Sequence, residues 1–241
     1  MIGLPPILLK LIKTPNNMRI GITSTQNNGK TTLVKAIQQL WPMYKTPSRT
    51  YRDIIKEQNL PINQDGTQES QEIIREALRE CAKENAAEKY MVHDRTILDN
   101  LAYSVYLSER NALADDFLAD SINMTRDTIK MFDIIFWLPL NTDIKIEPQE
   151  NRSTNAEYRR DIDYIFETMI ETYKKGSGLI FPIEDCPAII ELTGDLNEKL
   201  KTIREYINDD GDLVETEKSV FSDLSELYDQ AKLLGQVKEG K

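Results

Sequence analysis

Short apolar segments suited to β-strands alternate along this chain with longer segments that show helical periodicity. The apolar runs 18–22, 89–93, 133–138 and 188–192 have strand character, and the third, which ends at Pro139, is predicted to be central. Helical spacing of apolar residues predicts helices over 31–41, about 70–85, 98–105, about 114–131, 157–173 and 196–207. This alternation predicts an α/β fold with a mainly parallel sheet covered by helices on both faces. Ligands of such folds bind at the carboxyl ends of the strands.

Three segments depart from the alternating pattern. Residues 1–13 are apolar but interrupted by two prolines, and the lysines follow the apolar part, so we interpret residues 1–16 as a docking arm and not as a signal peptide. Residues 141–155 are polar and aperiodic, which predicts a mobile lid over about 141–160. After a charged turn, residues 208–241 are predicted to form a C-terminal helical tail, packed on the domain or partly frayed. The remaining residues, 17–207, are predicted to form the main domain.

Composition and charge narrow the classes of function. The 241 residues are 40% hydrophobic and 29% charged, which is typical of a globular domain. A formal net charge of -10 repels polynucleotides, so DNA is an unlikely partner. Two cysteines and one histidine are too few for a disulfide framework or a histidine-rich metal centre. No apolar run approaches the ~20 residues of a membrane span, and we expect a cytoplasmic protein that does not bind membranes.

The most informative motif lies between the first predicted strand and the first predicted helix. Residues 24–32 read Ser-Thr-Gln-Asn-Asn-Gly-Lys-Thr-Thr and end as the phosphate-binding loop G-x-x-x-x-G-K-[ST] does. In such a loop the backbone N–H groups and the helix N-terminus face the phosphates, Lys30 reaches the β- and γ-phosphates, and Thr31 binds Mg²⁺. We therefore predict ATP and Mg²⁺ as cofactors. The predicted nucleotide-binding residues are Asn27, Asn28, Gly29, Lys30, Thr31 and Thr32.

One position departs from the motif. Ser24 stands where the pattern has its first glycine, so this end of the loop has to turn without glycine's freedom at positive φ, and we expect a slightly reshaped loop. The alternative is a Gly-Lys-Thr sequence that only begins a helix. The preceding strand and the following amphipathic helix favour phosphate binding.

A second candidate for chemistry follows the second predicted strand. Asp94 can bind Mg²⁺ through water or accept a proton from an attacking hydroxyl, and Arg95 can bind a substrate phosphate or carboxylate with two hydrogen bonds. A surface ion pair or a helix cap by Asp94 is the structural alternative. His93 is interpreted as a strand-end residue and not as a catalytic acid.

Together with the loop, residues 93–103 (His-Asp-Arg-Thr-Ile-Leu-Asp-Asn-Leu-Ala-Tyr) resemble nucleoside and nucleotide kinases. The resemblance is to the thymidylate-kinase-like P-loop group, especially phage deoxynucleotide kinases, and also to nicotinamide riboside kinase-like AAA domains. It spans about 18–207, and it implies that Asp94 acts as base or metal carboxylate, that Arg95 orients the acceptor, and that Asp99 supports the site. If the protein is encoded by a phage, it would act in the host cytoplasm.

The predicted lid carries arginines. Arg152 and Arg159 belong to the sequence Arg-Ser-Thr-Asn-x-x-Tyr-Arg-Arg, and arginines of a mobile segment can cover the γ-phosphate and neutralise transition-state charge on closing. The resemblance implies a lid at this place. The alternative is a solvated helix start in which Arg159 and Arg160 pair with Asp161 and Asp163.

The acceptor site is predicted in the segment 45–52 and at the start of the next helix. Arg49 and Arg52 can hold a monophosphate, and Tyr51 can stack on a base. Gln71, and with it Gln68, can hydrogen-bond a base edge, although both also fit as exposed helix residues without a specific role.

These observations predict transfer of the γ-phosphate of ATP to a small nucleotide, a (deoxy)nucleoside monophosphate. Three alternatives stay open: a nucleoside kinase, a kinase of modified bases in DNA, and an NTP-binding switch without catalysis. The base, the sugar, ATP or GTP as donor, and homodimer formation also stay open. The predicted catalytic residues are Lys30, Asp94, Arg95, Arg152 and Arg159, and the predicted metal ligands are Thr31 and Asp94.

Overall fold

A parallel β-sheet forms the centre of the computed structural model, which describes residues 18–140 and 155–214. Its strands are β1 (Met18–Thr23), β2 (Tyr90–Asp94), β3 (Ile134–Trp137) and β4 (Ala188–Glu191). They lie in the order β2-β1-β3-β4, so β3 is an interior strand, as predicted. The register places Ile22 of β1 opposite Asp94, so that the ends of β1 and β2 meet where the phosphate loop begins.

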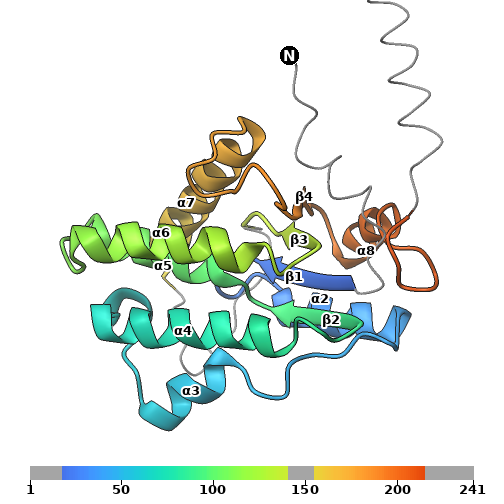
Figure 1. Cartoon of the computed structure of the whole chain (residues 1–241), viewed down its shortest axis with the longest axis horizontal. Coiled ribbons are helices and arrows are strands. Elements are labelled where there is room, and N and C mark those ends of the chain that lie inside the picture. The colour runs from blue at the N-terminus through green and yellow to red at the C-terminus, as the bar shows by residue number, and fades with distance from the viewer. Residues whose placement is uncertain (1–17, 141–154, 215–241) are drawn as a thin grey trace, which may run out of the picture.

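Helices follow the strands and complete the α/β fold that the sequence predicts (Figure 1). The α-helices are α2 (Lys30–Leu40), α3 (Tyr51–Gln58), α4 (Gln68–Glu84), α5 (Ile97–Ser108), α6 (Asp115–Ile129), α7 (Ala156–Lys174) and α8 (Leu196–Arg204), and Asn63–Asp65 forms a 3₁₀ turn. Figure 1 shows α4, α5 and α6 side by side, in agreement with their mutual contacts. None of the described helices is long and apolar enough to cross a membrane.

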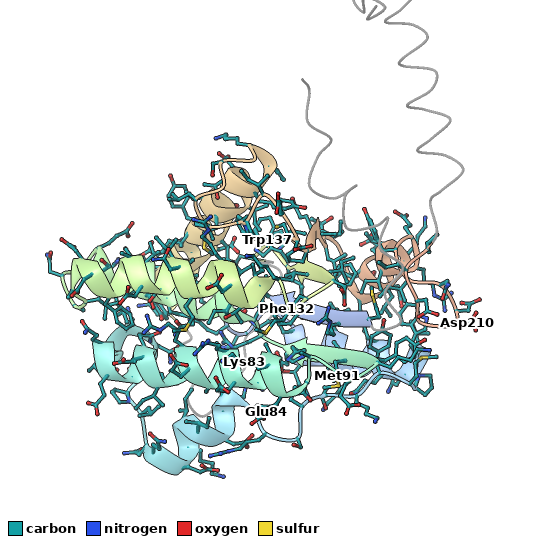
Figure 2. All side chains as sticks on the ribbon, viewed as in Figure 1. Lys83, Glu84, Met91, Phe132, Trp137 and Asp210 are labelled. Carbon is teal, nitrogen blue, oxygen red and sulfur yellow. The ribbon has the colours of Figure 1, made fainter. Side chains whose placement is uncertain are left out.

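Each face of the sheet has its own hydrophobic cluster, because successive side chains of a strand point to opposite faces. Ile134 and Phe136 of β3 belong to the cluster formed with α2 and α8. Ile135 and Trp137 belong to the larger cluster formed with α4 to α7, which also contains Phe132 (Figure 2). Both faces of the sheet are therefore covered by described residues, which leaves the strand ends as the expected place for a ligand.

The helix α3 was not predicted, since the sequence pattern predicts no helix between residue 41 and about residue 70. The reason is its length of eight residues, of which only Ile55 is buried, so it lacks an apolar stripe. A local signal does exist. Thr50 and Asp53 form a capping box, in which the Asp53 carboxylate accepts a hydrogen bond from the Thr50 backbone N–H at 2.7 Å.

The charged turn after α8 is held against the domain. Trp41 Nε1 donates to the carbonyl of Asn208 at 2.7 Å, Tyr44 Oη donates to the carbonyl of Gly211 at 2.7 Å, and Tyr90 Oη donates to Asp212 at 2.9 Å. The predicted arm over 1–16, residues 141–154 of the lid predicted over about 141–160, and residues 215–241 of the tail predicted over 208–241 lie outside the described residues. The last residues of the predicted lid, from Ala156 on, belong to the first turns of α7.

Candidate active site

The loop between β1 and α2 forms a small cavity suited to an anion. Gly29 caps α2 with φ 81°, and a Cβ at this position would meet no atom within 4 Å, so the space in front of its backbone is open. The cavity has a volume of about 60 Å³. It is lined by Asn27, Asn28, Gly29, Lys30, Thr31, Thr32, Arg52 and Arg95. Backbone N–H groups and the N-terminus of α2 give it a positive potential.

Serine is tolerated at the position of the motif's first glycine because the positive φ angles fall elsewhere. They occur at Asn27 (φ 54°) and Gly29, and asparagine is one of the few residues that adopts this conformation readily. The Ser24 side chain instead accepts a hydrogen bond from Asn28 Nδ2 at 3.1 Å. The same amide donates to the carbonyls of Leu138 and Pro139, at 2.9 and 2.8 Å, and so fastens the loop to the end of β3.

Lys30 lies inside the loop and lines the anion cavity. Its side chain is 4% exposed, and Nζ donates to the carbonyls of Ser24 and Thr25 at 2.8 and 2.5 Å. Burial, followed by the positive charge of Arg95, lowers the pKa of Lys30 to about 7, although Asp99, with Oδ1 4.0 Å from Nζ, opposes this. An anion bound in the cavity would stabilise the ammonium form.

Asp94, at the end of β2, joins the loop to the neighbouring strand. Its Oδ2 accepts a hydrogen bond from Thr31 Oγ1 at 2.6 Å and lies 3.2 Å from Arg52 Nη2. Burial opposes ionisation, but Arg52 and Lys30 hold the pKa of Asp94 below its usual value. Its Oδ1 is buried and has no hydrogen-bond partner among the described residues. A hydroxyl and an ionised carboxylate with a free oxygen are ligands that Mg²⁺ accepts, so the residues present fit this ion.

Arg95 follows β2 in a strained conformation. Its φ of 104° is unusual for a residue with a side chain, and such strain concentrates at functional sites. The guanidinium contacts the rings of Tyr51 and Tyr103, at 5.2 and 5.4 Å from their centroids, and Nη1 donates to Asp99 at 3.1 Å. Burial opposes the charge, but these three neighbours raise the pKa of Arg95 well above its ordinary value.

Asp99 organises this part of the site from the first turn of α5. Its carboxylate accepts from Thr23 Oγ1 at 2.6 Å and from the backbone N–H of Thr96 at 3.0 Å, the latter as part of a capping box. Only 1% of the side chain is exposed. The supporting role predicted for Asp99 therefore has a geometric basis.

A second and larger cavity opens beside the loop. Its volume is about 420 Å³, and Arg52 and Arg95 line both cavities. The larger one is lined by Gln26, Tyr51, Arg52, Asp53, Ile55, Lys56, Ile62, Asn63, Gln71, Ile74, Leu78, Arg95, Asp99, Asn100 and Tyr103. Aliphatic side chains from α3 and α4 face polar groups from the loop and α5. Such a lining suits a flat, partly polar ligand the size of a nucleoside.

Two buried amides in this larger cavity were not predicted. Gln26 Oε1 accepts a hydrogen bond from Tyr103 Oη at 2.5 Å, while Gln26 Nε2 is buried and has no hydrogen-bond partner among the described residues. Asn100 Nδ2 donates a hydrogen bond to Gln71 Oε1 at 2.9 Å, while Asn100 Oδ1 is buried and also has no hydrogen-bond partner among the described residues. Asn100 and Tyr103 belong to the sequence that resembles the kinases, but nothing in the sequence alone distinguished them from core residues.

The structure brings most of the predicted site residues together, but not all of them. Arg49 is 61% exposed, pairs with Glu57 at 2.5 Å and lines neither cavity, since it precedes α3. Gln68 lines neither cavity and accepts a hydrogen bond from the backbone of Ala114. Arg152 lies outside the described residues. Arg159 is buried behind the loop, where its side chain donates to loop carbonyls and does not line the anion cavity.

Comparisons with known proteins agree with this geometry. A protein-family model described as an AAA domain matches residues 19–176. No curated protein matches the sequence. Several solved structures share the fold, and three of them are named here. The first is the NadR protein in complex with NR, with a TM-score of 0.56 and 14% identity over 79% of this chain and 50% of that chain. The second is deoxyadenosine kinase from M. mycoides with bound dATP, with a TM-score of 0.56 and 19% identity over 78% of this chain and 98% of that chain. The third is thymidylate kinase from Candida albicans, with a TM-score of 0.54 and 14% identity over 82% of this chain and 95% of that chain.

The chain thus spans about half the length of the NadR chain and nearly all of the two kinases. At these identities the likeness shows the fold, which is that of P-loop nucleoside and nucleotide kinases. Because the family model covers well over half of the sequence, the chain belongs to the AAA domain family and has the P-loop kinase fold.

Proposed function

We propose that this protein transfers the γ-phosphate of ATP to a small nucleotide, a (deoxy)nucleoside monophosphate. The observation that carries the proposal is the position of Arg52 and Arg95, which line both the anion cavity and the larger cavity. In-line phosphoryl transfer needs positive charge between donor and acceptor, where the transferred group passes. Two guanidinium groups at this boundary meet that requirement.

On the donor side the loop would bind the phosphates of ATP. Its backbone N–H groups would donate hydrogen bonds to phosphate oxygens. The ammonium of Lys30, which donates to the carbonyls of Ser24 and Thr25, would donate to the phosphates instead. Thr31 and Asp94 would hold Mg²⁺, which would supply positive charge against the phosphates. Arg52, close to both of these residues, would then be free to contact the acceptor.

On the acceptor side the larger cavity would receive the nucleotide. Tyr51 and the aliphatic side chains of Ile55 and Ile74 offer surfaces for a base, and Gln26 Nε2 offers a donor without a partner among the described residues. Arg52 and Arg95 would bind the monophosphate at the end that faces the loop. Because Arg49 points away, the phosphate clamp consists of fewer arginines than predicted.

A nucleoside acceptor is the second candidate, and one atom favours it. Asp94 Oδ1 is buried and has no partner among the described residues, so it can accept a proton from an attacking hydroxyl. A monophosphate needs no such base, because its attacking oxygen is already ionised. The two candidates therefore assign Asp94 different roles.

The decisive experiment follows ATP consumption by coupled assay and products by ³¹P NMR, with all common nucleosides and nucleoside monophosphates as acceptors. We expect transfer to at least one monophosphate and none to its parent nucleoside. Phosphorylation of the nucleoside alone would establish the second candidate. Absence of transfer to every acceptor, together with absence of ATP binding, would refute the proposed function.

A further inference from the structure

The side chain of Arg159 reaches the phosphate loop from behind. Arg159 lies in the first turns of α7, on the turn after the N-cap residue Asn155. Its Nε donates to the carbonyl of Gln26 at 3.1 Å, and its Nη2 donates to the carbonyl of Asn27 at 3.2 Å. The guanidinium thus binds two consecutive carbonyls with two of its donors, and the residue is 4% exposed.

These two carbonyls bear on the shape of the loop. Asn27 has φ 54°, a left-handed conformation that costs free energy for a residue with a side chain. An alternation of right- and left-handed residues turns successive N–H groups to one side of the backbone, where they form a concave anion site, and leaves the carbonyls on the other side. A donor that binds the carbonyls on that side stabilises the arrangement in which the N–H groups face the anion.

The charge of Arg159 acts in the same direction. Burial lowers the pKa of Arg159, and the charge of Asp163 opposes this. Among the described residues no carboxylate lies within ion-pair distance of the guanidinium, and Asp163 instead accepts a hydrogen bond from the Leu140 backbone at 2.9 Å. Asp161, the other predicted partner, pairs with Arg110 at 3.0 Å. The positive charge behind the loop is thus not neutralised by a direct ion pair within this part of the chain, and it favours an anion in front of it.

We propose that Arg159 is a positioning residue of the donor site, which holds the 26–27 carbonyls and thereby presents the loop N–H groups to the α- and β-phosphates of a bound nucleotide. The inference rests on the proposed ATP binding. It differs from a lid arginine that contacts the γ-phosphate, because a γ-phosphate ligand acts only on ATP and on the transition state. A residue that shapes the loop acts on ADP as much as on ATP.

The test compares the binding of ATP and ADP by isothermal titration calorimetry in four proteins. These are the wild type, Arg159→Ala, Arg159→Lys and Arg160→Ala. The neighbouring Arg160 is exposed and has no hydrogen bond or ion pair to another described residue, so it controls for the loss of one positive charge on α7. Turnover with the acceptor is measured in the same four proteins.

We expect Arg159→Ala to weaken ATP and ADP by the same factor, roughly tenfold or more, since two hydrogen bonds from a charged donor are lost. A lysine has one point charge and cannot bind both carbonyls as a fork does, so Arg159→Lys should recover only part of the affinity for both nucleotides. Arg160→Ala should bind both nucleotides as the wild type does. The affinity for the acceptor should not change in Arg160→Ala.

Unchanged ADP binding in Arg159→Ala, with a fall in kcat, would overturn the inference in favour of a γ-phosphate contact. If each nucleotide binds all three variants with its wild-type affinity, the inference is overturned as well, while the proposed function stays intact. A wild type that binds neither ATP nor ADP would refute both. If Arg159→Ala does not fold, as judged by circular dichroism, Arg159→Lys decides, because full ADP affinity in that variant contradicts a two-donor role.

Discussion

The two cavities of this protein are built in different ways. The anion cavity comes almost entirely from one contiguous segment, residues 27–32, and offers backbone N–H groups and one lysine. The larger cavity, seven times its volume, is assembled from side chains of the loop, α3, α4 and α5. Backbone groups bind any triphosphate alike, whereas side chains can select among ligands. We therefore expect that, in the proposed kinase, donor binding and acceptor specificity change independently.

Arg52, Asp94 and Arg95 lie where these two regions meet. Arg52 contacts Tyr51 on the acceptor side, with Nε 3.0 Å from Oη, and Asp94 on the donor side. Arg95 lines both cavities and is fixed by Asp99. Substitutions in one region should therefore leave binding in the other intact, and substitutions at the boundary should affect transfer more than binding.

The largest effect is expected in the donor region. Lys30→Ala should lower kcat by ~10³-fold or more, because a charge that stabilises the transferring phosphoryl group is lost. The larger cavity should keep its affinity for the acceptor, which equilibrium binding can measure. The fold should persist, since the buried ammonium of Lys30 contributes little to the core, and a thermal melt checks this. Turnover within tenfold of the wild type would contradict the role of the loop.

At the boundary, Asp94→Asn should lower turnover by about 10²–10⁴-fold while ATP binding changes much less. The asparagine retains the shape and a hydrogen bond to Thr31 but has no charge for Mg²⁺ and no basic oxygen. Calorimetric titration with ATP and steady-state kinetics separate the two quantities. A parallel fall in ATP affinity and turnover would mean that Asp94 only supports the structure of the loop.

In the acceptor region, Ile74→Phe should raise KM for the acceptor by about tenfold and leave the affinity for ATP unchanged. Ile74 is buried in α4 and lines the larger cavity, so the added volume of the ring enters space that the acceptor would use. Leu33→Met, a change in the cluster on the opposite face of the sheet, is the matched control and should affect neither constant. An unaltered acceptor KM in Ile74→Phe would show that the acceptor binds elsewhere.

The same contrast decides how much could be predicted from the sequence. The loop is contiguous, so the residues that form it were all predicted. Only its attachments to the rest of the fold needed coordinates: Asn28 of the loop donates to the Leu138 carbonyl, and Arg159 donates to the Gln26 carbonyl of the loop. The acceptor side depends on where a short helix begins. Because α3 starts at Tyr51, Arg52 turns to the loop while Arg49 remains outside, and nothing in the sequence alone distinguishes these two arginines. The orientation of the Gln26 side-chain amide likewise depends on Tyr103, which is distant in the sequence and donates a hydrogen bond to Gln26 Oε1.

The smallest effect is expected at Asp163, which lines neither cavity. Burial raises the pKa of this carboxyl from 3.8 to about 6, although the Leu140 N–H and Arg159 oppose the rise. The native protein therefore binds this proton more tightly than the unfolded chain does, so ionisation of Asp163 destabilises the fold as the pH rises from about 4 to about 6.

Asp163→Asn removes this ionisation and keeps an oxygen that can accept the Leu140 hydrogen bond. One pKa unit corresponds to about 1.4 kcal/mol, so the variant should be more stable than the wild type at pH 7.5 by the order of 1–3 kcal/mol. This is a rise in Tm of a few degrees. The difference in Tm between the two proteins should shrink as the pH falls and vanish near pH 4, while ATP and acceptor affinities at pH 7.5 stay those of the wild type. A variant less stable than the wild type at pH 7.5 would show that the Asp163 charge is needed, and the region behind the loop would then be coupled to Arg159 through that charge.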